Sequence, residues 1–307
     1  MKSGSNLEKV LTAGIFAITG ECGPPRGANA EVVREKAKFL KGNVDSVNVT
    51  DNQTAVVRMS SLGASLILMQ EGVEPNLQMT ARDRNRIAIQ SDILGAYALG
   101  IRNMLCLSGD HQKFGDHPEA KNVFDLDSMQ LIQTVKKMRD EGTLINGHKL
   151  DGAPKMFIGC AANPFADPFE FRVYRLANKI DAGADFVQTQ CIYNLERFRK
   201  WVDQANDMGL LEKVFLMGGV TPMKSVGMAK YMKNSVPGMD VPDAIIKRLQ
   251  GVPKGDQAKE GIKIAVETIH ELREMKGISG VHLMAIEWEE RVPEIVEMAG
   301  MLPRPVL

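Results

Sequence analysis

A carboxylate that ends an apolar run is the first feature of this chain that could do chemistry. The run at residues 16–20 ends at Glu21, and the turn segment Gly23-Pro24-Pro25 follows directly. Alternation along a strand places Phe16 and Ile18 on one face and Glu21 on the other. A carboxylate held at a strand end by a stiff loop is suited to proton transfer. From this stretch alone, a solvated acid at a turn is an equally simple interpretation.

Polar residues also end most of the later apolar runs. The further candidate strand ends are Thr50, Thr80, Asp110, Asn163, Gln190, Gly218-Gly219 and Glu287. Alternation predicts an inward direction for Ser46, Asn48 and Thr50, for Gln78 and Thr80, and for Gln188 and Gln190. One polar strand end is unremarkable because loops begin there. Five or more on successive strands indicate a shared binding or catalytic site.

The side chains at these ends are those of an acid–base site with amides and few positive charges. Glu21 and Asp110 could serve as a proton donor and an electrostatic partner if their surroundings differ enough. Gln190 offers the paired donor and acceptor that an amide-bearing heterocycle needs. The chain contains no phosphate-binding glycine loop of the common nucleotide-binding types.

The histidines and cysteines do not predict a metal site or a disulfide framework. His111 and His117 lack a second histidine or cysteine at ligand spacing and are interpreted as loop residues. His282 lies within a candidate strand and is interpreted as an interior histidine with satisfied hydrogen bonds. The four cysteines are scattered without a Cys-x-x-Cys pair, which favours a reducing cytoplasmic location.

Helix and strand patterns alternate along the whole chain. The expected strands are residues 16–21, 45–50, 76–80, 103–107, 155–160, 185–190, 214–217 and 281–286. Ser5, Asn29, Ser60 or Ser61, and Asp127 are expected helix caps. Glycines expected to end helices are Gly42, Gly72, Gly100, Gly183, Gly209 and Gly277. Two helices, near 242–249 and 257–275, precede the last strand.

This alternation of strands and helices predicts an α/β protein: a single (β/α)₈ TIM barrel with extra helices before the last strand. An open, doubly wound sheet is the structural alternative. The 307 residues suit one such barrel, so residues 1–307 are expected to form one catalytic domain. Segments 110–122 and 233–240 are expected to be loops. The active site of a TIM barrel lies at the C-terminal ends of its strands, where the polar residues fall.

Charge and hydropathy restrict the class of partner. The 38 basic and 38 acidic side chains cancel, so the chain lacks the basic surface that nucleic acids or anionic membranes require. No apolar run approaches the roughly 20 residues of a membrane-spanning helix. The N-terminal segment lacks the apolar core of a signal peptide. The sequence leaves the oligomeric state open, and an oligomer is retained as an alternative.

Five segments, taken in order, carry a resemblance to a known family. They are Glu21 before Pro24-Pro25, Ser46-Val47-Asn48-Val49-Thr50, Leu107-Ser108-Gly109-Asp110, residues 181–190, and Leu302-Pro303-Arg304-Pro305. Together they resemble the methylenetetrahydrofolate reductases, in the compact prokaryotic form without a regulatory domain. The resemblance covers the chain from about residue 14 to the end.

The resemblance implies a flavoprotein oxidoreductase of one-carbon metabolism that reduces 5,10-methylenetetrahydrofolate to 5-methyltetrahydrofolate. Glu21 matches the general acid, which opens the substrate ring so that hydride can arrive from flavin N5. Asp110 matches the acid near the flavin and the pterin. The implied folate contacts are Gln190, Asp110 and Ile286. The implied flavin contacts are Thr50, Gln78, Thr80, Ser108, Gly109, Asp110, Asn163 and Lys179.

Several positions depart from the family members that bind FAD. Those members usually carry histidine, arginine, tyrosine and histidine where this chain has Gln78, Ser108, Asn163 and Asp167, and an acid near Arg172. The cofactor is therefore expected to be a flavin, either FMN or FAD, without a metal. Val226 stands where the family has an aromatic residue that stacks on the nicotinamide dinucleotide, which weakens the case for direct NAD(P)H oxidation.

This pattern is similar to the reductase subunit of anaerobic one-carbon routes, including the reductive acetyl-CoA pathway, whereas other members serve methionine biosynthesis. The similarity implies an iron-sulfur partner subunit that delivers electrons. This chain has no iron-sulfur cysteine motif, so any such cluster would belong to the partner. Two other functions remain open. One is a flavin-free, pterin-binding methyltransferase on the same barrel, and the other is a non-catalytic assembly subunit.

Overall fold

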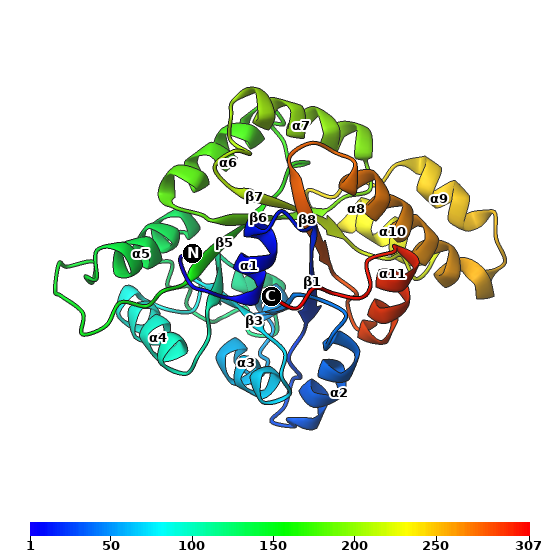
Figure 1. Cartoon of the computed structure of the whole chain (residues 1–307). Coiled ribbons are helices and arrows are strands. Elements are labelled where there is room, and N and C mark those ends of the chain that lie inside the picture. Colours follow the sequence, from blue (N-terminus) through cyan, green and yellow to red (C-terminus); the bar gives the residue numbers. More distant parts are fainter.

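Eight parallel strands form a closed barrel in the computed structural model, which describes residues 1–307 (Figure 1). Each strand pairs with its neighbours in sequence, and β8 closes the barrel against β1. The closure confirms the predicted (β/α)₈ barrel and rules out the open sheet. The strands are β1 Ala17–Cys22, β2 Ser46–Val49, β3 Pro75–Thr80, β4 Asn103–Leu107, β5 Phe157–Ala162, β6 Phe186–Cys191, β7 Phe215–Val220 and β8 Ile278–Leu283.

Helices surround the barrel, and three of them separate β7 from β8 (Figure 1). The α-helices are α1 Asn6–Thr12, α2 Glu31–Leu40, α3 Ser61–Gln70, α4 Arg86–Ala98, α5 Ser128–Asp140, α6 Phe171–Ala182, α7 Leu195–Asp207, α8 Val226–Ser235, α9 Asp243–Gln250, α10 Gln257–Arg273 and α11 Val292–Met298. Short 3₁₀ turns occupy η1 Gln53–Ala55, η2 Gln112–Phe114, η3 Lys254–Asp256 and η4 Glu289–Arg291. No helix is long and apolar enough to cross a membrane.

Most helix boundaries follow the predicted capping residues. The side chains of Ser5, Ser60 and Asp127 each accept a hydrogen bond from a backbone N–H in the first turn, as expected. All six glycines predicted to end helices have a positive φ. The expected Asn29 cap was wrong by one residue, because Ala30 is the N-cap and Asn29 accepts from the N–H of Glu31 instead.

The last strand and its surroundings differ from the sequence-based expectation. β8 begins three residues earlier than expected and ends at Leu283. Gly280 is the register partner of Ala17, and a Cβ there would lie 2.4 Å from the Ala17 carbonyl oxygen, so the strands approach closely at a glycine. Part of the expected loop at 233–240 belongs to α8, which extends to Ser235.

The barrel interior changes from apolar to polar along the strands. At the N-terminal end, the rings of Phe157 and Phe186 stack with centroids 5.0 Å apart, and α1 adds Leu7 to the same buried cluster. Two residues beyond Ala17 on β1 and Phe186 on β6, the inward positions are Thr19 and Gln188, and these two side chains are hydrogen-bonded to each other. The sequence therefore builds an apolar floor below a polar layer.

Both ends of the chain meet at the N-terminal end of the barrel, beside α1 (Figure 1). Arg304 binds Asp45, and Lys2 binds Asp185. The two buried aspartates also accept hydrogen bonds from the strand backbone, Asp45 from Ile18 and Asp185 from Ile158. This arrangement closes the end of the barrel opposite the predicted site.

The cysteine thiols should be inert in the native protein. All four are unpaired and buried. Burial raises the pKa of Cys22 to about 12 and those of Cys160 and Cys191 to about 11, and it also raises that of Cys106. Because the thiolate is the reactive form, a thiol-exchange reagent at pH 8 should label the native chain negligibly and all four cysteines after unfolding. Rapid native labelling would contradict this burial.

Candidate active site

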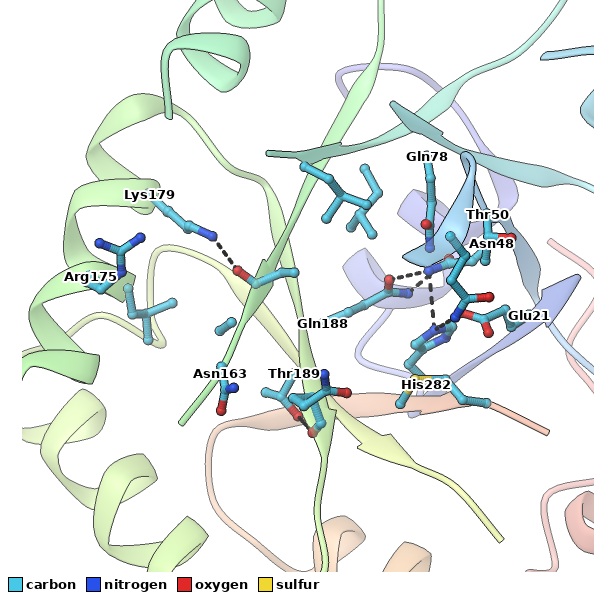
Figure 2. A pocket seen from close by; sticks show the side chains of 18 of the residues that line it. Glu21, Asn48, Thr50, Gln78, Asn163, Arg175, Lys179, Gln188, Thr189 and His282 are labelled. Carbon is cyan, nitrogen blue, oxygen red and sulfur yellow. Dashed lines mark hydrogen bonds and ion pairs between the residues drawn. The ribbon is translucent and has the colours of Figure 1, made fainter. Parts of the chain in front are cut away.

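A pocket of about 390 Å³ opens at the C-terminal ends of the strands (Figure 2). Six predicted site residues line it: Glu21, Thr50, Gln78, Asn163, Lys179 and Gln190. Further polar lining residues are Asn48, Gln53, Arg172, Arg175, Gln188, Thr189 and His282. Its apolar lining consists of Leu105, Leu107, Ala161, Ala162, Leu176 and Met284. Four of the eight predicted strand ends, Glu21, Thr50, Asn163 and Gln190, therefore lie on one cavity, whereas the other four do not line it.

Glu21 and His282 lie side by side at one side of this pocket (Figure 2). The Glu21 residue is 9% exposed, and its Oε2 lies 3.6 Å from Nε2 of His282. β1 positions Glu21 two residues beyond Thr19, whose register partner across the β1–β8 pair is His282. The carboxyl group is thus nearly buried, opens to the cavity and has the imidazole of His282 as its neighbour.

A chain of side-chain hydrogen bonds fixes the layer below Glu21. Thr19 Oγ1 lies 3.0 Å from His282 Nδ1, and Gln188 Nε2 donates to Thr19 Oγ1 at 2.9 Å. Asn48 Nδ2 donates to Gln188 Oε1 at 2.6 Å, and Asn76 Nδ2 donates to Asn48 Oδ1 at 2.7 Å. His282 is therefore an interior histidine held by neighbours, as expected, but it also lines the pocket.

A register shift in β6 brings three consecutive residues to the pocket. The pairing between β6 and β7 is irregular between Gln188 and Cys191. Such irregularities re-aim side chains at barrel rims. Gln188, Thr189 and Gln190 consequently all line the cavity. Strict alternation predicts Gln188 and Gln190 but excludes Thr189.

A row of cations from α6 forms the opposite side of the pocket from Glu21 (Figure 2). Arg172, Arg175 and Lys179 are three and four residues apart, a spacing that places them on one helix face. Lys179 Nζ donates to the Ala161 carbonyl at 2.5 Å. None of the three forms an ion pair with a carboxylate of the chain, whereas most arginines here do. The arrangement suits a bound anion.

The remaining predicted residues lie outside the pocket lining. Asp110 is exposed, and its carbonyl accepts a hydrogen bond from Arg82. Thr80 Oγ1 donates to Asp51, and Ser108 Oγ accepts from the backbone N–H of Ser128. Gly109 has a φ of +88°, and a Cβ there would lie 3.1 Å from Thr80 and Arg82. Ile286 is 39% exposed on the loop after β8.

One buried polar atom in the pocket lacks a partner within the chain. The hydroxyl oxygen of Thr50, at the end of β2, has no hydrogen bond. Buried polar atoms are nearly always paired, so a ligand in the pocket would complete this site. No group of three or more histidine, cysteine, aspartate or glutamate side chains is arranged to hold a metal ion.

Fold and pocket together define a TIM-barrel protein with an acid–amide site at one side and a cationic edge at the other. The family model described as methylenetetrahydrofolate reductase matches residues 6–300. The chain therefore belongs to the methylenetetrahydrofolate reductase family.

Sequence identity to individual relatives is low. The chain is 25% identical over 257 residues to a probable methylenetetrahydrofolate reductase (NADPH) of Caenorhabditis elegans, covering 81% of this chain and 36% of that protein. It is 21% identical over 296 residues to the 5,10-methylenetetrahydrofolate reductase of Pectobacterium carotovorum, covering 94% and 92%. The chain thus spans about a third of the nematode relative and nearly all of the bacterial one.

A solved structure shares the fold. It is an uncharacterized protein from Clostridium thermocellum, described as binding two copies of 5-methyl-5,6,7,8-tetrahydrofolic acid, with a TM-score of 0.65 and 15% identity. The comparison covers 96% of this chain and 98% of that one.

Proposed function

We propose that residues 1–307 form a catalytic domain that reduces 5,10-methylenetetrahydrofolate to 5-methyltetrahydrofolate with a bound flavin. The observation that carries the proposal is the nearly buried Glu21 at the end of β1, open to the pocket in a chain of this family. A low-dielectric, water-poor site favours a carboxyl group as a proton donor. We also propose a cytoplasmic location, in line with four unpaired cysteines.

The residues present fit a flavin. Thr50 leaves a buried hydroxyl free for a ligand, and the amides of Gln78 and Asn163 can donate and accept as an isoalloxazine edge requires. Arg172, Arg175 and Lys179 would hold the phosphate end. A bound flavin would supply the hydride. The family positions Thr80, Ser108, Gly109 and Asp110 do not line the pocket and are retained as contacts proposed from the family resemblance.

The chain's own groups have separate tasks in this proposal. Glu21 gives its proton to the ring nitrogen of the folate, which opens the ring and prepares the methylene carbon for hydride. Gln190 binds the pterin through its amide, with Asp110 and Ile286 completing the folate side. Leu105 and Leu107 contribute apolar lining to the same pocket. Proton donation and substrate orientation thus come from different strands.

We further propose that electrons come from an iron-sulfur partner subunit. Val226 is the first residue of α8. It stands where the family has an aromatic residue that stacks on the nicotinamide dinucleotide. The cation row favours a flavin that ends in a phosphate, as FMN does, although FAD also carries phosphates.

Releasing the chromophore from the purified chain and identifying it by mass decides between FMN and FAD. FMN without NADH oxidation supports the partner-fed reductase. FAD with rapid NADH oxidation contradicts it, and absence of any flavin favours the methyltransferase.

Arg175→Gln should weaken flavin binding by about tenfold or more, because a charge-assisted hydrogen bond contributes about 1.5–3 kcal/mol. The dissociation constant is measured by titrating deflavinated protein with the flavin and following its fluorescence. Arg199→Gln on α7, whose guanidinium pairs with Glu271 away from the pocket, is the matched control. Equal affinities for both variants would remove Arg175 from the proposed phosphate site.

A further inference from the structure

The turn that follows β2, residues 52–55, has a backbone conformation that residues other than glycine rarely adopt. Asn52, Thr54 and Ala55 have φ values of +43°, +56° and +58°. Thr54 is β-branched, so the left-handed conformation is most strained there. Strained residues of this kind persist only where surrounding contacts fix them. Gln53 belongs to this turn and lines the pocket, so the conformation of the turn determines part of the pocket wall.

Arg82, two residues beyond β3, supplies one of these contacts from a buried position. Its Nη2 donates to the Asn52 carbonyl at 3.2 Å, and its Nη1 donates to the Asp110 carbonyl at 3.0 Å. The side chain is 3% exposed, and its counter-ion Asp83 accepts from Nε at 2.8 Å and from Nη2 at 2.7 Å. A guanidinium is planar and always charged, so its donors keep fixed directions. One side chain thus ties the loop after β2 to the loop after β4.

The loop after β4 encloses the same turn. A Cβ at Gly115 would lie 1.8 Å from the Ala55 carbonyl oxygen, so the two loops touch at a glycine. Arg82 holds both ends of this second loop, because its side chain binds the Asp110 carbonyl and its own carbonyl accepts from the Val123 N–H at 2.8 Å. The strained turn therefore lies between a buried guanidinium and a loop that the same residue anchors.

We propose that Arg82 is a positioning residue that keeps the turn at 52–55 left-handed and thereby keeps Gln53 in the pocket wall. Arg82 does not line the pocket itself. Without the guanidinium, the Asn52 carbonyl loses its charged donor, and the turn can relax to the right-handed conformation that Thr54 prefers. The ligand should then bind less tightly. The inference rests on the proposed function for the identity of that ligand, a flavin.

The test compares flavin affinity and local hydrogen exchange in Arg82→Met and wild type. We expect the variant to bind FMN or FAD, whichever the wild type carries, about tenfold more weakly, a factor that matches the cost of one left-handed residue. The amides of Ala55 and Val56, which donate within the turn, should exchange faster by mass spectrometry. Arg102→Met is the matched control, because Arg102 donates to two backbone carbonyls just before β4, away from the pocket. It should bind the flavin like wild type.

A glycine at the strained position distinguishes positioning from a general loss of stability. Glycine adopts the left-handed conformation without steric cost, so adding Thr54→Gly to Arg82→Met should return the flavin affinity toward wild type. A residue that only stabilised the fold would not be rescued at Thr54. Arg82→Lys keeps the charge but lacks the planar fork. It should show a smaller loss, and it serves if Arg82→Met does not fold.

Unchanged flavin affinity in both Arg82 variants, or no recovery on adding Thr54→Gly, would overturn the inference. A wild-type chain that binds no flavin would instead overturn the proposed function. Hydrogen exchange would then decide the inference alone, with faster exchange of the turn in Arg82→Met supporting it and equal exchange contradicting it.

Discussion

Glu21→Gln should retain bound, reducible flavin while folate reduction falls by about 10²–10⁴-fold, the usual contribution of a general acid. Glutamine keeps the shape and the polar contacts of the nearly buried side chain but has no proton to give at neutral pH. The half-reactions separate the two effects, because flavin reduction does not use Glu21 and ring opening does. Stopped-flow absorbance of the flavin during each half-reaction is the measurement.

The matched control is Glu287→Gln, which neutralises a carboxylate just beyond β8 that does not line the pocket. This variant should reduce the folate at the wild-type rate. If Glu21→Gln keeps wild-type activity, Glu21 is not the acid. If both variants lose activity equally, the effect is one of net charge and not of a proton donor.

Arg304→Met should destabilise the fold by about 3–5 kcal/mol, the cost of leaving one member of a buried ion pair alone. The Arg304 side chain is 7% exposed and donates twice to Asp45, whose side chain is fully buried. Arg304 also donates to the Phe16 carbonyl at the start of β1. Its loss leaves a buried carboxylate next to the strand that carries Glu21. Chemical denaturation followed by circular dichroism gives the free energy of unfolding.

Arg291→Met is the control for Arg304, because its guanidinium pairs with Glu294 at an exposed position. Exposed pairs contribute at most about 1 kcal/mol, so this variant should unfold close to wild type. Similar losses in both variants would show that methionine, and not the buried pair, causes the change. A wild-type free energy for Arg304→Met would contradict the role of the closed N-terminal end.

The fold could be predicted because two local signals agree along the whole chain. Glycines with positive φ, such as Gly183 and Gly277, end helices where the next strand must begin. Strand alternation then placed Glu21, Asn48 and Thr50 in the pocket, since inward positions of a barrel must follow period two. These signals depend only on residues close in sequence, which is why they can be read without a structure.

The missed site residues have causes beyond local periodicity. Thr189 reaches the pocket through a register shift that only the β6–β7 pairing reveals. Arg172 and Arg175 lie on helix α6, and the two-residue alternation of strands does not predict which face of a helix lines the pocket. Asp110 and Ile286, which remain proposed contacts from the family resemblance, lie in loops past the strand ends, where alternation does not determine the direction of a side chain. His282 was correctly placed in the interior, but its contact with Glu21 requires the closure of β8 on β1.

The most direct test of the central claim is a single turnover of the purified flavin-loaded chain. The flavin is reduced chemically without oxygen, mixed with 5,10-methylenetetrahydrofolate, and followed by absorbance while the products are identified by mass. We expect flavin reoxidation with one equivalent of 5-methyltetrahydrofolate, without NADH and without a partner protein. A flavin that stays reduced in the presence of bound folate, with no methyl product, would contradict the proposed reductase.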